Sequence, residues 1–93
     1  IAMQQAAFAL AAGDAEAVLR LTDASIDVAA RYQNAALLAT LMMFKAEALD
    51  MQGDTAMADA IRLDSLGWAR YGFGSDANVQ ARLDEIAALR PFL

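Results

Sequence analysis

The stretch Asn34–Gly53, NAALLATLMMFKAEALDMQG, is the most apolar part of the chain and decides the fold. Wound as a helix at about 100° per residue, it places its apolar side chains on two neighbouring stripes that cover more than half of the circumference. The first stripe consists of Leu37, Leu41, Phe44 and Ala48, and the second of Leu38, Met42, Ala46 and Leu49. A helix at the edge of a bundle needs only one narrower stripe. We therefore predict a central helix that is packed on two sides.

The rest of this helix is polar enough to argue against a membrane span. Its remaining face consists of Thr40, Met43, Glu47 and Asp50, and we expect this face to contact solvent. The uncharged run 34–44 is about half of the roughly 20 residues that a spanning helix needs. Lys45, Glu47 and Asp50 follow this run directly. We therefore predict no membrane span.

The totals exclude several classes of function. A chain of 93 residues makes one domain, residues 1–93, which buries roughly 60–65% of its unfolded surface. It has no cysteine for a disulfide or thiolate metal site, and no histidine, the commonest general base and metal ligand. Its net charge of −5 gives no counterion-release affinity for nucleic acid. We predict a non-enzymatic protein without cofactor, metal or nucleic-acid partner.

The chain begins at Ile1 and not at methionine, so we expect a processed or truncated piece of a longer protein. No signal peptide is visible. The compartment stays open, because the periplasm would fit if a signal peptide has been removed and the cytoplasm would fit otherwise.

Turn residues divide the chain into five predicted helices. Gly13-Asp14 and Gly53-Asp54 each combine a glycine, which suits the left-handed end of a helix, with an aspartate, which suits the next N-cap. Gln33-Asn34 forms a further turn, and Ser75 after the loop 72–74 is a good N-cap. The predicted helices are 1–12, 15–32, 34–53, 55–71 and 76–89, and Pro91 ends the last one.

The apolar stripes of the other helices predict how each one packs. We expect Phe8 to anchor the first helix. The fourth helix has two stripes, Ala56, Ala60, Leu63, Gly67 and Tyr71 on one, and Met57, Ile61 and Trp68 on the other. The small residues of its first stripe would allow a neighbouring helix to approach closely. The last helix has a single stripe, with Val79, Leu83, Ile86 and Ala87, so we expect it to close the array from outside.

The sequence repeats itself weakly at a distance of about 40 residues, as expected of helical hairpins that stack. Here the chain resembles the tetratricopeptide-repeat superfamily. The resemblance covers residues 1–71 and is carried by Ala46, Leu49, Gly53-Asp54 and Ala58, and in the first unit by Ala6, Ala9, Gly13-Asp14 and Val18. The chain departs from the repeat in three ways. Its spacing is nearer 40 than 34 residues, and the closing proline is missing, with Arg70 near its place. Lys45 and Arg62 stand at positions that are usually apolar.

The resemblance implies an all-α array of antiparallel helical hairpins that binds protein segments and has no catalytic role. Hairpin 1 would span about residues 1–32, hairpin 2 about 34–72, and a capping helix about 75–90. The function we favour is a protein-interaction or scaffolding module that binds a peptide or helix. The alternatives are a homodimerisation domain, because 59% of the residues are hydrophobic and the mean hydropathy is +0.33, and a small acidic subunit of a larger assembly.

Lys45 and Asp64 each interrupt an apolar arc, on the third and fourth helices. In a hairpin folded about Gly53 the two residues lie within a turn of each other. We predict that they form a partly buried ion pair, which would fix the register of the hairpin more than it stabilises it. The alternatives are a snorkelling Lys45 and a ligand-binding role.

Six residues are candidates for partner binding. Trp68, Arg70 and Tyr71 belong to the residue types that dominate binding hot spots, although Trp68 and Phe73 would also serve to pack the loop against the last helix. Tyr32, Met43 and Leu66 are poorly placed for the core and would extend a partner surface. A monomer with an open groove between the second and fourth helices favours peptide capture, whereas a dimer that buries Tyr32, Met43 or Leu66 favours self-association.

The carboxylates form no convincing catalytic site. Asp23 and Asp27 lie on the charged face of the second helix, which the alternation of signs assigns to solvent. Asp54 is more simply an N-cap than a partner of Asp50, and Glu47 with Asp59 is the only other close pair. Gly72-x-Gly74 follows a helix and lacks the third glycine of a nucleotide-binding loop.

Overall fold

The computed structural model describes residues 2–89 and shows an all-α fold, as predicted. Its helices are α1 Ala2–Ala11, α2 Ala15–Arg31, α3 Ala35–Met51, α4 Thr55–Phe73 and α5 Asp76–Ala87. No strand occurs among the described residues. The predicted end of the last helix at Pro91 lies outside them.

Each turn is held by the capping residue that the sequence offers. The side chains of Asp14, Asn34, Asp54 and Ser75 accept hydrogen bonds from backbone N–H groups three residues further on, at 3.1–3.3 Å. The residue before each of the first three caps has a positive φ, 78° at Gly13, 56° at Gln33 and 85° at Gly53. The first three turns therefore share one geometry, and Gln33 adopts a conformation that favours glycine.

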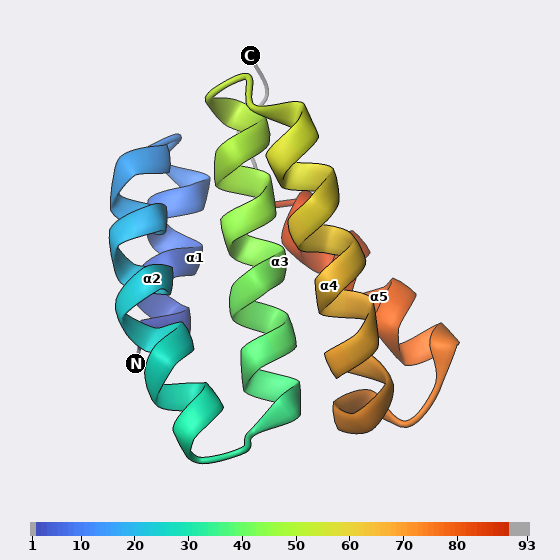
Figure 1. The fold of residues 1–93 in the computed structure, drawn as a ribbon. Helices are drawn as coiled ribbons and strands as arrows, with labels where there is room; N and C mark the ends of the chain where they lie inside the picture. Colours follow the sequence, from blue (N-terminus) through green and yellow to red (C-terminus); the bar gives the residue numbers. More distant parts are fainter. Residues whose placement is uncertain (1, 90–93) are drawn as a thin grey trace.

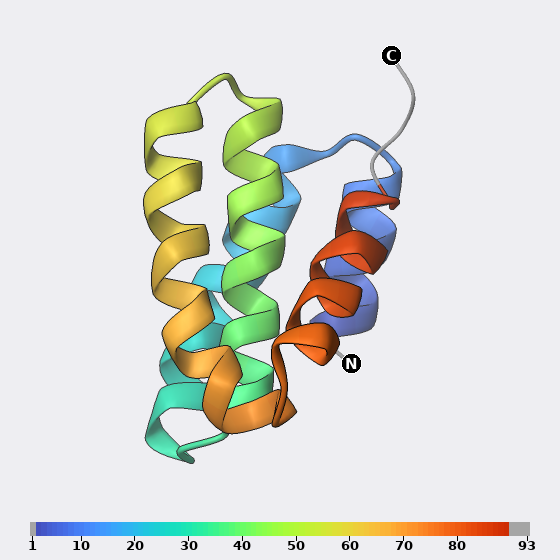
Figure 2. The same cartoon turned by 90° about the vertical axis from the view of Figure 1, so that its right-hand side faces the viewer.

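Helix α3 is the centre of the molecule. Figure 1 shows α2, α3 and α4 side by side as one layer with α3 in the middle, and Figure 2 shows α1 and α5 on one face of that layer. Consecutive helices contact each other, and α3 also contacts α1 and α5. The predicted central helix is thus packed on three sides and not on two.

The third packed side covers the face of α3 that we expected to be wet. Met43 is 1% exposed and lies in a cluster with Leu10 of α1, Ala69 of α4 and Ile86 of α5. The prediction of Met43 as a partner-binding residue is therefore wrong, because α1 and α5 both lie across this side of α3. Thr40 is also buried, and its hydroxyl donates to the carbonyl of Ala36 at 2.8 Å, so it carries no unsatisfied group into the core.

Two helices bury the opposite face from the one predicted. In α1 the buried residues are Ala6 and Leu10, and Phe8 is 77% exposed, so it is not the anchor. In α4 the buried residues are Ala58, Ser65 and Ala69. Small side chains face inwards because the backbones come close: a Cβ added at Gly72 would lie 2.5 Å from the Cα of Ala36.

The last helix buries Val79 and Ile86 in the core as predicted, whereas Ala87 of the predicted stripe is exposed. Arg82 of this helix lies over the ring of Phe73, 5.8 Å from its centre, which ties α5 to the end of α4. Within residues 2–89, no helix is both long enough and apolar enough to cross a membrane.

Candidate functional site

An apolar groove lies at the end of the layer where α2 turns into α3 and where α4 ends. It has a volume of about 610 Å³. Ala30 and Gln33 form its α2 side, Ala35 and Leu38 of α3 form its floor, and Trp68 and Tyr71 form its α4 side. A concave, mostly apolar surface of this size is typical of a binding site. This groove is the candidate functional site.

The two aromatic residues of the groove are exposed. Trp68 is 47% and Tyr71 86% exposed, whereas Leu38 beneath them is 6% exposed. Both aromatics were predicted as partner-binding residues, and the structure brings them together on the last turns of α4. Phe73, and not Trp68, is the aromatic residue that packs against the core near the last helix. Trp68 therefore keeps a large apolar surface available to a partner.

Lys45 pairs with α2 and not with α4. Its Nζ lies 2.7 Å from Oδ1 of Asp23, and its side chain is 27% exposed. Asp64 is exposed, and within residues 2–89 it belongs to no ion pair, so the predicted Lys45–Asp64 pair is not formed. The reason is that α2 and α4 flank α3 on opposite sides, and Lys45 lies on the α2 side. The pair therefore joins α2 to α3 at a partly exposed position.

The edges of the groove are acidic. On α2, Asp27 is exposed one turn before Ala30, and on α4, Asp64 is exposed one turn before Trp68. Neither aspartate takes part in an ion pair among the described residues, whereas Asp23, a turn before Asp27, is neutralised by Lys45. Arg31 is also exposed and directly follows Ala30, so two aspartates and one arginine lie near the apolar floor of the groove.

A second charged cluster lies between α3 and α4 and centres on Arg62. Its guanidinium donates to Oε1 of Glu47 at 3.0 Å, to Oδ2 of Asp50, and to Oδ1 of Asp59 at 3.3 Å. Burial alone would lower the pKa of Arg62, but the hydrogen bonds to Asp50 and Glu47 raise it above its usual value. Arg62 therefore stays charged and balances Glu47, which is only 7% exposed. The cluster is structural, and it explains how α3 buries a carboxylate.

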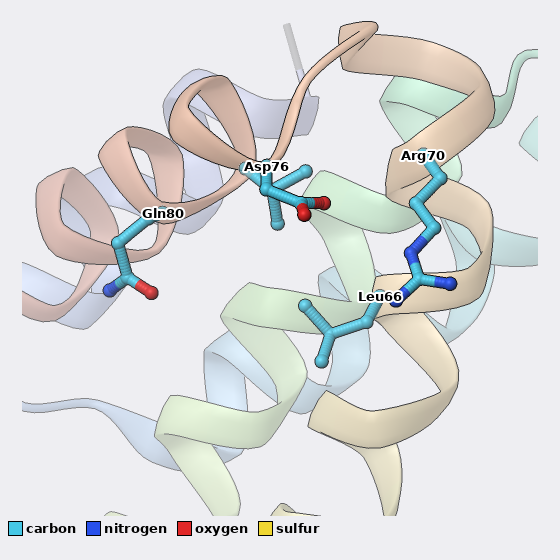
Figure 3. Close-up of a pocket in the computed structure, with 5 residues that line it drawn as sticks. Leu66, Arg70, Asp76 and Gln80 are labelled. Atoms are coloured by element: carbon cyan, nitrogen blue, oxygen red, sulfur yellow. The ribbon is translucent and has the colours of Figure 1, made fainter.

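Leu66 and Arg70 lie on the other side of α4, away from the groove. They line a smaller pocket of about 200 Å³ with Val79, Asp76 and Gln80 of α5 (Figure 3). The carboxylate of Asp76 points towards the α4 side of this pocket, but within residues 2–89 no ion pair joins it to Arg70. Leu66 packs partly against the core. Leu66 and Arg70 thus do not belong to the aromatic groove.

Tyr32 is 79% exposed but does not line the groove. Of the six predicted partner-binding residues, only Trp68 and Tyr71 therefore line the groove, and Leu66 and Arg70 lie together in the smaller pocket. The α2 side of the groove, with Ala30 and Gln33, was missed because a small side chain next to a turn gives no signal of its own. Within residues 2–89, no group of three or more acidic side chains is placed to hold a metal ion.

Comparison with family models, with curated proteins and with solved structures found no match for this chain. The tetratricopeptide resemblance thus stays a prediction.

Proposed function

We propose that this protein is a non-catalytic interaction module that holds an amphipathic helix of a partner protein in the groove between α2 and α4. The observation that carries the proposal is the pair of exposed aromatics, Trp68 and Tyr71, above the buried Leu38. Grooves of this kind bind helices through apolar anchors spaced by three or four residues. Exposed Trp and Tyr are the side chains that most often supply the binding energy at such sites.

The charge at the rim selects the chemistry of the partner helix. Asp27 of α2 and Asp64 of α4 each lie one turn from a residue that lines the groove, and neither belongs to an ion pair within residues 2–89. Complementary charge at the edge of an interface contributes to specificity and to the rate of association. We therefore propose a partner helix with an apolar stripe and with Lys or Arg along both edges of that stripe.

The packing between α3 and α4 supports the same function. Ala46, Leu49 and Ala58, which carry the tetratricopeptide resemblance, pack together as one cluster where α3 meets α4. The resemblance implies binding of protein segments. A lysine-edged helix in the groove agrees with that implication.

The protein carries its own reporter for the test. Trp68 is the single tryptophan and lines the groove, so a ligand that covers it should shift its fluorescence to shorter wavelength. We would titrate the protein with two synthetic amphipathic peptides that have the same leucine stripe, one edged with Lys and one edged with Glu. The Lys peptide should bind with a shift, and the Glu peptide should bind at least about tenfold more weakly.

A matched pair of variants on α2 locates the binding site. Ala30→Arg places a long side chain in the groove, whereas Ala24→Arg makes the same change at an exposed position that does not line it. Ala30→Arg should abolish the fluorescence shift, and Ala24→Arg should leave it unchanged. If Ala30→Arg binds the Lys peptide as the wild type does, the groove is not the site. If both peptides bind equally, the aspartates near the groove do not select the partner.

A further inference from the structure

The outward face of α4 carries a second exposed surface, which shares only Tyr71 with the groove. Its members recur every three or four residues, and we call them the outer stripe: Ala56, Ala60, Leu63, Gly67 and Tyr71. All are exposed, and no charged residue interrupts them over four turns. Helix α4 forms an edge of the three-helix layer, and α5 begins beside its end and runs behind it (Figure 1). The stripe has the pattern of a packed helix face, but its residues stay exposed in the part of the chain that the structure describes.

The outer stripe places an exposed leucine one turn from a glycine, and we call the open space over that glycine the hollow. Leu63 is 70% exposed. One turn further on, a Cβ added at Gly67 would meet no atom within 4 Å, so the glycine leaves open space beside the leucine. A surface of this shape is complementary to a copy of itself turned end over end, because Leu63 of each copy then enters the hollow at Gly67 of the other.

We infer that a second copy of this chain packs on the outer stripe, with its α4 antiparallel and with a twofold axis level with Ser65. This surface is different from the groove, and the inference does not rest on the proposed function. At this register Ala60 of one copy lies opposite the region of Arg70 in the other, and Tyr71 covers Ala56 and Asp59. The interface is isologous, so each contact occurs twice.

The charges beside the stripe select the antiparallel orientation. Asp59 and Arg70 are eleven residues apart, which is close to three helical turns, so they lie on the same edge of α4. The antiparallel register brings Asp59 of each copy to Arg70 of the other, whereas a parallel pairing would place like charges together. Arg70 belongs to no ion pair within residues 2–89. Asp59 is 70% exposed and lies 3.3 Å from Arg62, but it shares that single cation with Glu47 and Asp50. Arg70 can therefore pair with the exposed carboxylate of Asp59 in the other copy, which one shared arginine does not neutralise.

The dimer has a consequence for the groove. The twofold axis is perpendicular to the layer of α2, α3 and α4, so both grooves face the same side of the dimer. Two linked helices, or two helices on one partner surface, would then be held together more tightly than one.

The test is the oligomeric state of the full chain, measured by sedimentation equilibrium from micromolar to submillimolar concentration. The wild type should dimerise. Gly67→Gln fills the hollow and should weaken the dimer at least about tenfold, while its monomer stays folded because the added side chain has open space. Ala24→Gln, at an exposed position on α2, is the matched control and should dimerise as the wild type does.

A charge exchange tests the register. Asp59→Arg and Arg70→Asp should each weaken the dimer about tenfold, because each creates two like-charge contacts, and the double variant should recover most of the affinity. Circular dichroism confirms that each variant is folded. A monomeric wild type overturns the inference. So does a dimer that tolerates Gly67→Gln, or a double variant no better than the single ones.

Discussion

Helix α4 contains two glycines at which the same substitution by alanine should change the free energy of unfolding in opposite directions. A methyl group at Gly72 would lie 2.5 Å from both the N and the Cα of Ala36 and 2.8 Å from its Cβ. A methyl group at Gly67 would meet no atom within 4 Å. Gly72→Ala and Gly67→Ala therefore make the same chemical change in one helix, with and without a steric obstacle.

The magnitudes follow from the distances. Carbon atoms pack best at about 3.5–4.0 Å, so Gly72→Ala forces the end of α4 to move about 1 Å away from the start of α3. Overpacking of this kind costs about 1–3 kcal/mol, and a gain of up to about 1 kcal/mol in helix propensity offsets part of it. We expect Gly72→Ala to lower the free energy of unfolding by about 2 kcal/mol, and Gly67→Ala to raise it by up to about 1 kcal/mol.

The measurement is urea unfolding followed by far-ultraviolet circular dichroism, at low protein concentration so that self-association does not contribute. The slope of the transition should be unchanged, because neither variant alters the surface that unfolding exposes. A Gly72→Ala protein as stable as the wild type would refute the close approach of α4 to α3. Trp68 and Tyr71 lie on the same turns as Gly72, so the geometry of the groove depends on this contact.

Two further substitutions test the turns and the charged cluster. Gln33→Gly should raise the free energy of unfolding by about 0.5–1 kcal/mol in the same assay, because Gln33 has a φ of 56°; Gly53→Gln, at a φ of 85°, should lower it by a similar amount, and equal stabilities would mean that this conformation carries no strain. Arg62→Met should lower the free energy of unfolding by about 2 kcal/mol, between the values for exposed and buried ion pairs, because Glu47 stays buried without this cation. Adding Glu47→Gln should recover part of this loss. If it recovers nothing, the loss does not come from the carboxylate of Glu47.

The sequence predicts the helices and the turns of this fold well, because both depend on local chemistry. A glycine that permits a positive φ and an aspartate that caps the next helix act within a few residues, and Gly13-Asp14 and Gly53-Asp54 do so here. The central place of α3 is also predicted, because its apolar arc is too wide for an edge helix. The sequence of a single helix and its flanking turns is therefore enough to predict where the helix ends and whether it is central.

The faces of α1 and α4 were not predictable in this way. Counting bulky apolar residues assigns Phe8 and Leu63 to the core, yet both are exposed. The buried faces consist of small residues such as Ala58 and Ala69, because helices that approach closely exclude large side chains. Hydrophobicity alone does not distinguish a small residue that is buried from one that lies in solvent.

Lys45 shows a different limit. In a hairpin folded about Gly53, Lys45 lies at about the same height as Asp64 of α4. The height of a residue along its helix does not say which neighbouring helix its side chain faces. Helices α2 and α4 lie on opposite sides of α3, and the charge is satisfied by Asp23 on the α2 side. Choosing between Asp23 and Asp64 requires the angular position of both neighbours, which only the tertiary structure supplies.

Tyr71 belongs to both proposed surfaces, and this decides which variants are informative. It lines the groove and also ends the outer stripe, so a change at Tyr71 would weaken peptide binding and dimerisation together. Ala30 touches only the groove, on α2, and Gly67 lies only on the outer stripe. If Gly67→Gln yields a monomer that still binds the Lys-edged peptide, the two surfaces act independently. If Gly67→Gln instead weakens peptide binding as well as dimerisation, although Ala30 and the rest of the groove are unaltered, the second copy must contribute to the groove. Tyr71 is the residue through which it would do so.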